Sequence, residues 1–165
     1  MKALHITDVK DFTNKLFIGD VFDSFLLNQA SITTFATFSI DGRLQYDFFD
    51  TGEQEILSES ARDFALWKEI KPQCFSVIRG KRAPLQFKIV LQASPRVTAA
   101  LFQKNGMEFS EKEIFFLNLQ YKNRSLLCTT GSSLNQFYAG KKPLHLWDEA
   151  VVDFFHRRQI QFEEI

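Results

Sequence analysis

The 165-residue sequence is poor in the residues and motifs that most often mark a function. Its two cysteines, Cys74 and Cys128, are far apart and form no CxxC motif. GxGxxG, P-loop, GxSxG and HExxH patterns are all absent, so no common nucleotide, hydrolase or metalloprotease site is indicated. We therefore predict no catalytic residue, no metal and no cofactor.

Long hydrophobic runs are missing as well. No apolar stretch approaches the roughly 20 residues that cross a bilayer as a helix. Lys2 is followed by no continuous apolar core, so the start of the sequence does not resemble a signal peptide. We expect a cytoplasmic protein with reduced thiols and no membrane partner. A catalytic cysteine needs a base nearby and none is indicated, so both cysteines are interpreted as buried structural thiols.

An excess of charge of either sign is also lacking. Lysine and arginine total 20, and aspartate and glutamate total 20. No overall field would therefore draw the chain to nucleic acid or to an anionic membrane, and any such binding has to come from a local patch.

Phenylalanine is plentiful, with 19 residues against three tyrosines and two tryptophans. A phenylalanine ring has no polar group, so most of these rings are expected to fill the core. The alternative is that some of them form an exposed patch that binds a partner. Hydrophobic residues make up 45% of the chain and charged residues 24%, which indicates one soluble globular domain at this length.

The apolar periodicity predicts the same order of elements twice. A strand, a helix and a β-rich stretch are expected at 2–6, 8–18 and 23–49. A strand and a helix return at 85–92 and 95–104, followed by further strands. The predicted fold class is α+β, with two βαβββ-like halves that form antiparallel sheets.

The predicted domain organisation is a single domain that covers residues 1–165. Its parts are two halves, a helical insertion and a C-terminal helix, at about 1–50, 84–140, 60–80 and 144–158, respectively. No linker or low-complexity tract divides the chain.

Local signals place turns and breaks in the first half and the insertion. The Asp41-Gly42 pair predicts a hairpin, with either a two-residue loop or, as the buried face favours, a three-residue loop. The favoured register pairs Phe38 with Leu44. The polar stretch 51–60 is expected to be a loop. Pro72 is expected to kink the helical insertion or to divide it into two short helices.

Similar signals apply to the second half. The Ser94-Pro95 pair predicts the start of a helix, because it offers a cap residue followed by proline. A two-residue turn at Asn123-Arg124 would pair Tyr121 with Leu126 across a hairpin. A further short strand is predicted at 136–139.

Seven basic residues are candidates for contact with nucleic acid or another anion. They occupy the first helix, the loop before the strand at 85–92 and the second helix, and are Lys10, Lys15, Arg79, Lys81, Arg82, Arg96 and Lys104. The helix pairs stand at related places in the repeat, and a basic patch is what binds a phosphate backbone. The alternative is ordinary solvated surface charge, because Asp8 and Asp11 dilute the first pair.

Two other groups of polar residues carry weaker signals. Glu149, Asp153 and His156 are spaced to share one face of the last helix, where they could hold a metal if a second helix supplied ligands. The segment 129–133, Thr-Thr-Gly-Ser-Ser, offers hydroxyl and N–H groups that could cradle a phosphate. We prefer the alternatives, which are a solvated helix face and a turn after a strand.

Four segments resemble an uncharacterised bacterial protein family. They run from Asp23 (DSFLLNQASITTF) to Gly42, from Gly80 (GKRAPLQFKIV), from Cys128 (CTTGSSL) and from His145 (HLWD). The resemblance covers the whole chain. It implies no known activity, and so it transfers no catalytic residue to this sequence.

The predicted order of elements also resembles one domain of a DNA sliding clamp. That resemblance implies two sheets with two helices on one side, and it would direct the helices at 8–18 and 95–105 toward DNA. A clamp ring needs several such domains, so the chain would have to oligomerise or act without closing a ring.

The sequence favours a binding or interaction protein over an enzyme. The leading hypothesis is a cytoplasmic clamp-like module that associates with itself, with a protein partner or with nucleic acid. The alternatives are an enzyme of unrecognised type, whose site is assembled only by the fold, and a structural protein that presents an exposed phenylalanine or Trp147 patch.

Overall fold

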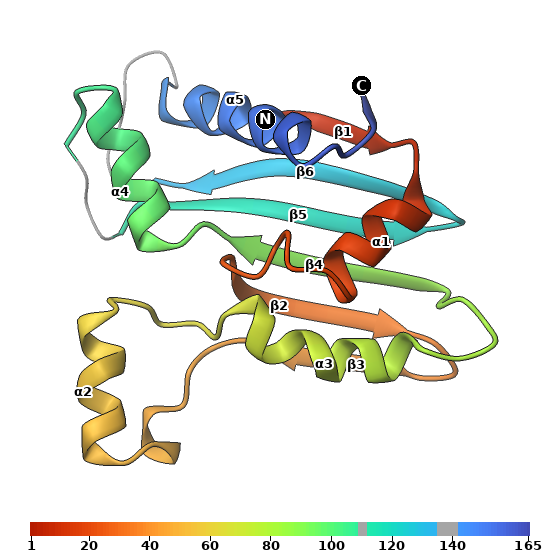
Figure 1. The fold of residues 1–165 in the computed structure, drawn as a ribbon, viewed down its shortest axis with the longest axis horizontal. Coiled ribbons are helices and arrows are strands. Elements are labelled where there is room, and N and C mark those ends of the chain that lie inside the picture. The colour runs from red at the N-terminus through yellow and green to blue at the C-terminus, as the bar shows by residue number, and fades with distance from the viewer. Residues whose placement is uncertain (109–111, 135–141) are drawn as a thin grey trace.

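The computed structural model describes residues 1–108, 112–134 and 142–165. Within these residues the chain forms one antiparallel sheet in the order β3-β2-β4-β5-β6-β1-β7 (Figure 1). The strands are β1 (Ala3–Ile6), β2 (Leu26–Thr33), β3 (Thr37–Asp41), β4 (Gln86–Gln92), β5 (Ile114–Lys122), β6 (Ser125–Ser133) and β7 (Phe162–Glu164). The helices are α1 (Val9–Phe17), α2 (Thr51–Glu59), α3 (Trp67–Ile78), α4 (Pro95–Lys104) and α5 (Lys142–Arg157), with a 3-10 turn at Tyr46–Phe48. The predicted α+β class is confirmed.

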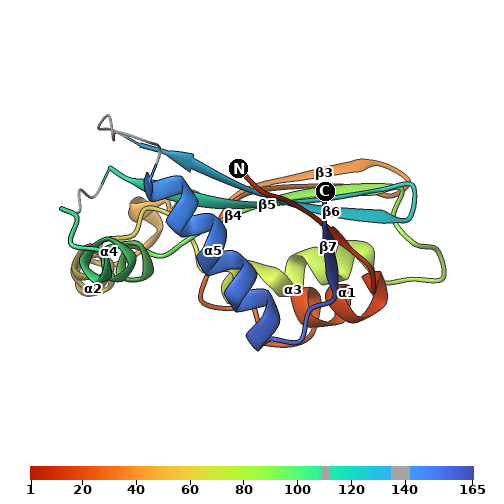
Figure 2. The same ribbon diagram turned by 90° about the horizontal axis from the view of Figure 1, so that it is seen from above.

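The described helices lie on one side of the sheet, and none of them covers the other side, which we call the open face (Figure 2). Strand residues alternate between the two faces. On the helix side, Phe87, Ile89 and Leu91 of β4 are at most 2% exposed, whereas Gln86 and Lys88 are exposed. The core is therefore one-sided. Among the described residues, no helix combines the length and the apolar character needed to cross a membrane.

Helix α1 packs on the sheet through one apolar face. Asp8 caps its N-terminus by accepting a hydrogen bond from the N–H of Asp11. Phe12 is fully buried, and its ring lies 5.3 Å from that of Phe22 and 6.1 Å from that of Phe155. These rings come from two helices and a connecting segment, so phenylalanine does fill the core, as the composition predicts.

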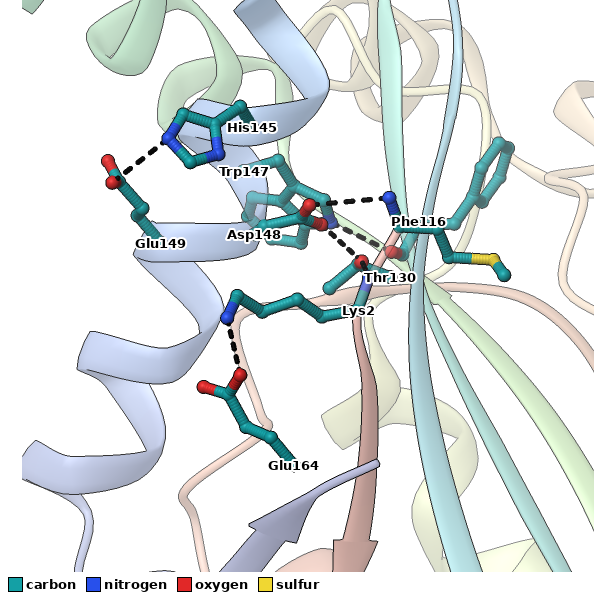
Figure 3. Close-up of polar contacts among 9 residues, drawn as sticks. Lys2, Phe116, Thr130, His145, Trp147, Asp148, Glu149 and Glu164 are labelled. Carbon is teal, nitrogen blue, oxygen red and sulfur yellow. Dashed lines mark hydrogen bonds and ion pairs between the residues drawn. The ribbon is translucent and has the colours of Figure 1, made fainter.

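Helix α5 is fixed to the sheet by polar contacts as well as by its apolar face (Figure 3). The indole Nε1 of Trp147 donates to the carbonyl oxygen of Phe116 at 2.8 Å. Asp148, which is only 6% exposed, accepts a hydrogen bond from the hydroxyl of Thr130 on β6. The same hydroxyl oxygen accepts the N–H of Lys2 at 2.8 Å, just before β1. Thr130 of β6 therefore joins α5 to the segment that precedes β1.

The first half departs from its predicted hairpin. Strands β2 and β3 are joined by a turn at 34–36 rather than at Asp41-Gly42, and Phe38 pairs with Ile32 instead of a residue beyond the Asp-Gly pair. Gly42 lies at a close approach, because a Cβ there would come within 1.8 Å of the carbonyl oxygen of Leu27. The glycine is required where the chain leaves the sheet, and the hairpin prediction was wrong.

The first half is shorter than predicted, and the two halves share one sheet. The first half contains strand, helix, strand and strand, without the third consecutive strand of a βαβββ unit. The described part of the second half contains β4, α4, β5 and β6. β2 pairs with β4 and β1 pairs with β6, which joins the halves in one sheet rather than two. The predicted strand at 136–139 lies outside the described residues.

In the region between the halves, one prediction is wrong and one of two alternatives is excluded. The stretch 51–60, predicted as a loop, contains α2, and Asp50 caps it by accepting the N–H of Glu53 at 2.8 Å. Helix α3 continues through Pro72 without division. Pro72 and Lys68, whose carbonyl loses its helical partner, both lie on the exposed side of α3, where water can satisfy that carbonyl.

Strand β4, the start of α4 and the hairpin between β5 and β6 are as predicted. Ser94 caps α4 by accepting a hydrogen bond from the N–H of Val97 at 3.3 Å. Tyr121 pairs with Leu126. Asn123 and Arg124 between them have φ angles of 53° and 61°, which suits a two-residue type I′ turn.

Candidate functional site

A groove opens at one end of the sheet, where α3 leads into β4. We call it the basic groove, and it is lined by Thr34, Phe35, residues 76–83 and Leu85. The N–H of Leu85 donates to the carbonyl of Thr33 at 2.9 Å, which ties the loop after α3 to the end of β2. The groove has a volume of about 670 Å³, which is within the usual range for binding pockets.

The basic groove combines exposed apolar surface with positive charge. Phe35 is 93% exposed and Leu85 is 69% exposed. Arg79, Lys81 and Arg82 are exposed beside them. None of the residues described as lining the groove is acidic. Apolar side chains that gather at the surface next to charge of one sign are typical of a site that binds a partner.

The local backbone explains why this segment projects from the domain. The N–H of Arg79 still makes the last helical bond of α3, to the carbonyl of Phe75 at 2.8 Å. Gly80 then has a φ of 154°, which residues with a side chain rarely adopt, so the chain turns away from the helix. Across the groove, the buried hydroxyl oxygen of Thr34 makes no hydrogen bond to any described residue. It could accept or donate one to a bound group.

Two further basic residues lie at the same end of the sheet. Lys122 and Arg124 belong to the hairpin between β5 and β6. In the sheet, Lys122 of β5 is the strand partner of Gln86 of β4, and Gln86 is also the strand partner of Thr33 of β2. The hairpin tip and the basic groove are therefore at one end, as Figure 1 shows. Positive charge at this end comes from two separate loops.

The structure brings together only part of the predicted basic set. Arg79, Lys81 and Arg82 share the groove, but the other four residues lie on helices. These are Lys10 and Lys15 on α1, and Arg96 and Lys104 on α4. Helices α1 and α4 lie toward opposite ends of the sheet in both views (Figures 1 and 2). Lys15 also forms an ion pair with Asp11 at 2.6 Å. The two helix pairs therefore do not form one patch.

The two other groups of polar candidates lie within a strand and on the exposed face of a helix. The segment 129–133 lies inside β6, where its backbone pairs with β5, so the expected turn is not formed there. Glu149, Asp153 and His156 are on the exposed face of α5, and Glu149 pairs with His145 at 3.2 Å (Figure 3). In the part of the chain that the structure describes, no three metal-ligating side chains come together.

Both cysteines lie in the core. Burial raises the pKa of the Cys74 thiol to about 12 and raises the pKa of the Cys128 thiol well above its usual value. Both side chains are free thiols, and at neutral pH they stay protonated. They act as small apolar core residues, and their predicted burial is confirmed.

A second hollow, of about 540 Å³, lies between the start of α1 and the turn after α5. It is lined by polar residues that include Asp8, Lys15 and His156. Asp8 already caps α1, and Lys15 already pairs with Asp11 and donates to the carbonyl of Gln159. Its charged groups thus serve the fold, and the basic groove is the stronger candidate.

Phe35 and Leu85 are the groove residues that sequence reasoning missed. Threonine and phenylalanine around Phe35 favour a strand, so the sequence did not predict that Phe35 lies exposed at a turn. A usable signal was the charge pattern, because residues 70–107 contain seven lysines and arginines and no aspartate or glutamate. A one-sign run of this length points to the groove residues near its centre.

Comparison with known proteins gives one result. No curated protein and no solved structure gives a significant match, so the resemblance to a clamp domain is not shown by any of these comparisons. A model of a family of unknown function, DUF5721, matches residues 15–163. That match includes the basic groove, most of the sheet, the last residues of α1 and all of the other described helices. The chain therefore belongs to the DUF5721 family, a family of unknown function.

Proposed function

We propose that the chain is a protein-binding module that docks an acidic, partly apolar segment of its partner in the basic groove. The observation that carries this proposal is the exposure of Phe35 and Leu85 beside Arg79, Lys81 and Arg82. Apolar side chains of a partner would remove the first two from water. Its carboxylates would complement the three cations and set the direction of binding.

The apolar contacts supply most of the affinity. Full burial of an exposed phenylalanine or leucine side chain gives about 1.5–3 kcal/mol, whereas an exposed ion pair gives about 0.2–1 kcal/mol. Association also costs several kcal/mol in lost freedom. The expected complex is therefore of moderate affinity and sensitive to salt, because its partner choice depends on charges at the rim.

Single-stranded nucleic acid is the second candidate ligand. An exposed ring such as Phe35 beside cations can stack a base, and Lys122 and Arg124 extend the positive surface at this end. Leu85 and Val77, however, are aliphatic and offer no stacking platform. The composition of the groove therefore favours a protein segment.

Fluorescence anisotropy with three labelled probes tests the proposal. The probes are an amphipathic peptide of glutamate and leucine, its lysine counterpart and an oligothymidine. We expect the acidic peptide to bind, and more weakly as salt rises. The groove variant, Lys81→Glu with Arg82→Glu, should weaken binding of that peptide by about tenfold or more, as should Leu85→Ser.

The chain offers matched controls for charge and for apolar surface. The α4 control variant, Arg96→Glu with Lys104→Glu, makes the same change of charge at two exposed positions of a helix away from the groove. Ile18→Ser removes another exposed apolar side chain. Both should bind as the unaltered chain does. Equal losses in the groove and control variants would contradict the proposal, and preferential binding of oligothymidine would support nucleic acid instead.

A further inference from the structure

The charges of this neutral chain are strongly segregated. Residues 45–61, which we call the acidic arm, contain five carboxylates and no lysine or arginine. Residues 70–107 contain seven lysines and arginines and no carboxylate. Salt screens exposed charges that are more than about 8–10 Å apart. Of these seven lysines and arginines, Arg79, Lys81 and Arg82 line the basic groove. The arm and the groove therefore carry charge of opposite sign, although the net charge of the chain is zero.

The acidic arm stands beside the sheet and is not packed over it. Figure 1 shows α2 projecting away from the rest of the domain. On α2 only Leu57 is buried, whereas Ile56 is 69% exposed. Phe48, in the turn before α2, is 85% exposed. Exposed apolar side chains next to carboxylates on the arm match exposed apolar side chains next to cations in the groove.

The arm has a defined shape of its own. The amide of Gln54 donates to the carbonyl of Tyr46 at 2.8 Å, and the hydroxyl of Tyr46 donates to the carbonyl of Arg62 at 3.1 Å. A short neck joins the arm to the sheet, where the N–H of Leu44 donates to the carbonyl of Asp63 at 2.8 Å. A surface that is already ordered loses less conformational freedom on binding.

The arm cannot reach the basic groove of its own copy. It precedes the N-terminus of α3, and the groove follows the C-terminus of α3. A helix of 12 residues is about 18 Å long, and Figure 1 shows the arm and the loop 79–85 on opposite sides of the domain. Contact between the arm and the groove therefore has to form between two copies.

We infer that the acidic segment docked in the basic groove is the arm of a second copy of this chain, and that two copies form a closed dimer. This inference rests on the proposed binding role of the groove and identifies its partner. When two α3 helices lie antiparallel about a two-fold axis, each arm faces the groove of the other copy. Both contacts form at once, and such closed two-fold pairs are the commonest assemblies.

Charge reversal on each surface tests the inference. The arm variant is Glu55→Lys with Glu59→Lys, which alters two exposed side chains and places lysine toward the end of α2 that its dipole favours. The groove variant is Lys81→Glu with Arg82→Glu. Sedimentation equilibrium of the full chain should show a dimer, and each variant alone should raise its dissociation constant by about tenfold or more.

The decisive sample is an equimolar mixture of the arm variant and the groove variant. The acidic arm of the groove variant meets the unaltered groove of the arm variant. The lysine-substituted arm of the arm variant meets the glutamate-substituted groove of the groove variant. Both contacts are therefore again between opposite charges. The mixture should recover a dimer close in affinity to that of the unaltered chain. Failure to recover it would overturn the inference.

The remaining outcomes separate this inference from the proposed function. The α4 control variant should dimerise normally, and circular dichroism should show that every variant is folded. A monomeric chain whose groove still binds the glutamate–leucine peptide overturns the dimer and leaves the proposed function standing. A monomeric chain that does not bind that peptide overturns both. A mass that keeps rising with concentration overturns the closed pair.

Discussion

Helices α2 and α5 both carry apolar side chains, yet only α5 has a continuous apolar face that is buried against the sheet. α5 buries Trp147, Val151 and Phe155, whereas α2 buries only Leu57. The reason is position, because α5 lies along β6 and β1, whereas α2 projects beside the sheet (Figure 1). Apolar contacts of α5 therefore stabilise the fold, while the exposed side chains of α2 are left free to stabilise an association.

The largest effect is expected from a change in the buried face of α5. Phe155 is fully buried, and its ring lies 6.1 Å from that of Phe12 and 5.7 Å from that of Phe162. Phe155→Ala should lower the free energy of unfolding by about 3–5 kcal/mol, because it removes these contacts and leaves a cavity. Urea unfolding, at concentrations where the chain is monomeric, measures the loss.

The matched change on α2 is Ile56→Ala. Ile56 is 69% exposed, so this substitution should change the free energy of unfolding of the monomer by less than about 0.5 kcal/mol. A loss similar to that of Phe155→Ala would mean that α2 contributes to the core as α5 does, and the comparison between the two helices would fail.

A smaller effect is expected where α5 is joined to the sheet by polar contacts (Figure 3). Thr130→Val keeps the shape of the side chain but removes the hydroxyl that donates to Asp148 and accepts from the N–H of Lys2. A buried carboxylate that loses a partner costs about 1–3 kcal/mol. Urea unfolding measures this loss as well.

Thr129→Val is the control for this prediction. Thr129 is the preceding residue of β6, and its side chain is on the open face of the sheet opposite Asn118. The substitution should therefore cost less than about 0.5 kcal/mol. If Thr129→Val and Thr130→Val lose the same stability, the polar join of α5 adds nothing to its apolar packing.

The parts of the fold that the sequence predicts well are those with strong local signals. Alternation marks β4, the Ser94-Pro95 pair marks the start of α4, and the Asn123-Arg124 turn fixes the β5–β6 register. The turn at 34–36 has no glycine, proline or asparagine. Its place depends on the pairing of β2 with β4, which is far away in the sequence. The turn was instead predicted at Asp41-Gly42, because Asp-Gly is a strong local signal for a hairpin turn.

The α2 prediction failed for a different reason. Residues 51–59 include Gly52 and several carboxylates, which favour a loop when taken alone. The spacing of Asp50 and Glu53 is nevertheless that of a capping box, with an acidic residue three positions after the cap. The apolar side chains behind it are too few to show a buried helical face, so periodicity could not correct the prediction.

The candidate site was predictable only in its charges. Arg79, Lys81 and Arg82 stand together in the sequence and remain together in the structure. Phe35 and Leu85 are 50 positions apart, and only the bond from Leu85 to the end of β2 brings them to one groove. A groove between distant segments follows from strand pairing, which local patterns do not specify.

The smallest effect in this comparison concerns the cap of α2. Asp50 accepts the backbone N–H of Glu53, and this hydrogen bond lowers the pKa of the Asp50 carboxyl. Asp50→Ala removes the cap and should make local opening of α2 more frequent. Because α2 adds little to the core, the loss should appear as about fivefold faster amide exchange in residues 51–59 of the monomer. The midpoint of global unfolding should not change.

Asp50→Asn and Ser94→Ala complete this test, which compares α2, a helix that projects from the sheet, with α4, a helix that packs on the core. Asparagine caps a helix about as well as aspartate, so Asp50→Asn should keep slow exchange in α2. Ser94 caps α4, which buries Phe102 in the core, so Ser94→Ala should lower the global unfolding free energy by about 1 kcal/mol. If Asp50→Ala also lowered global stability by that amount, α2 would unfold together with the sheet, and its exposed side chains could not be treated as separate from the fold.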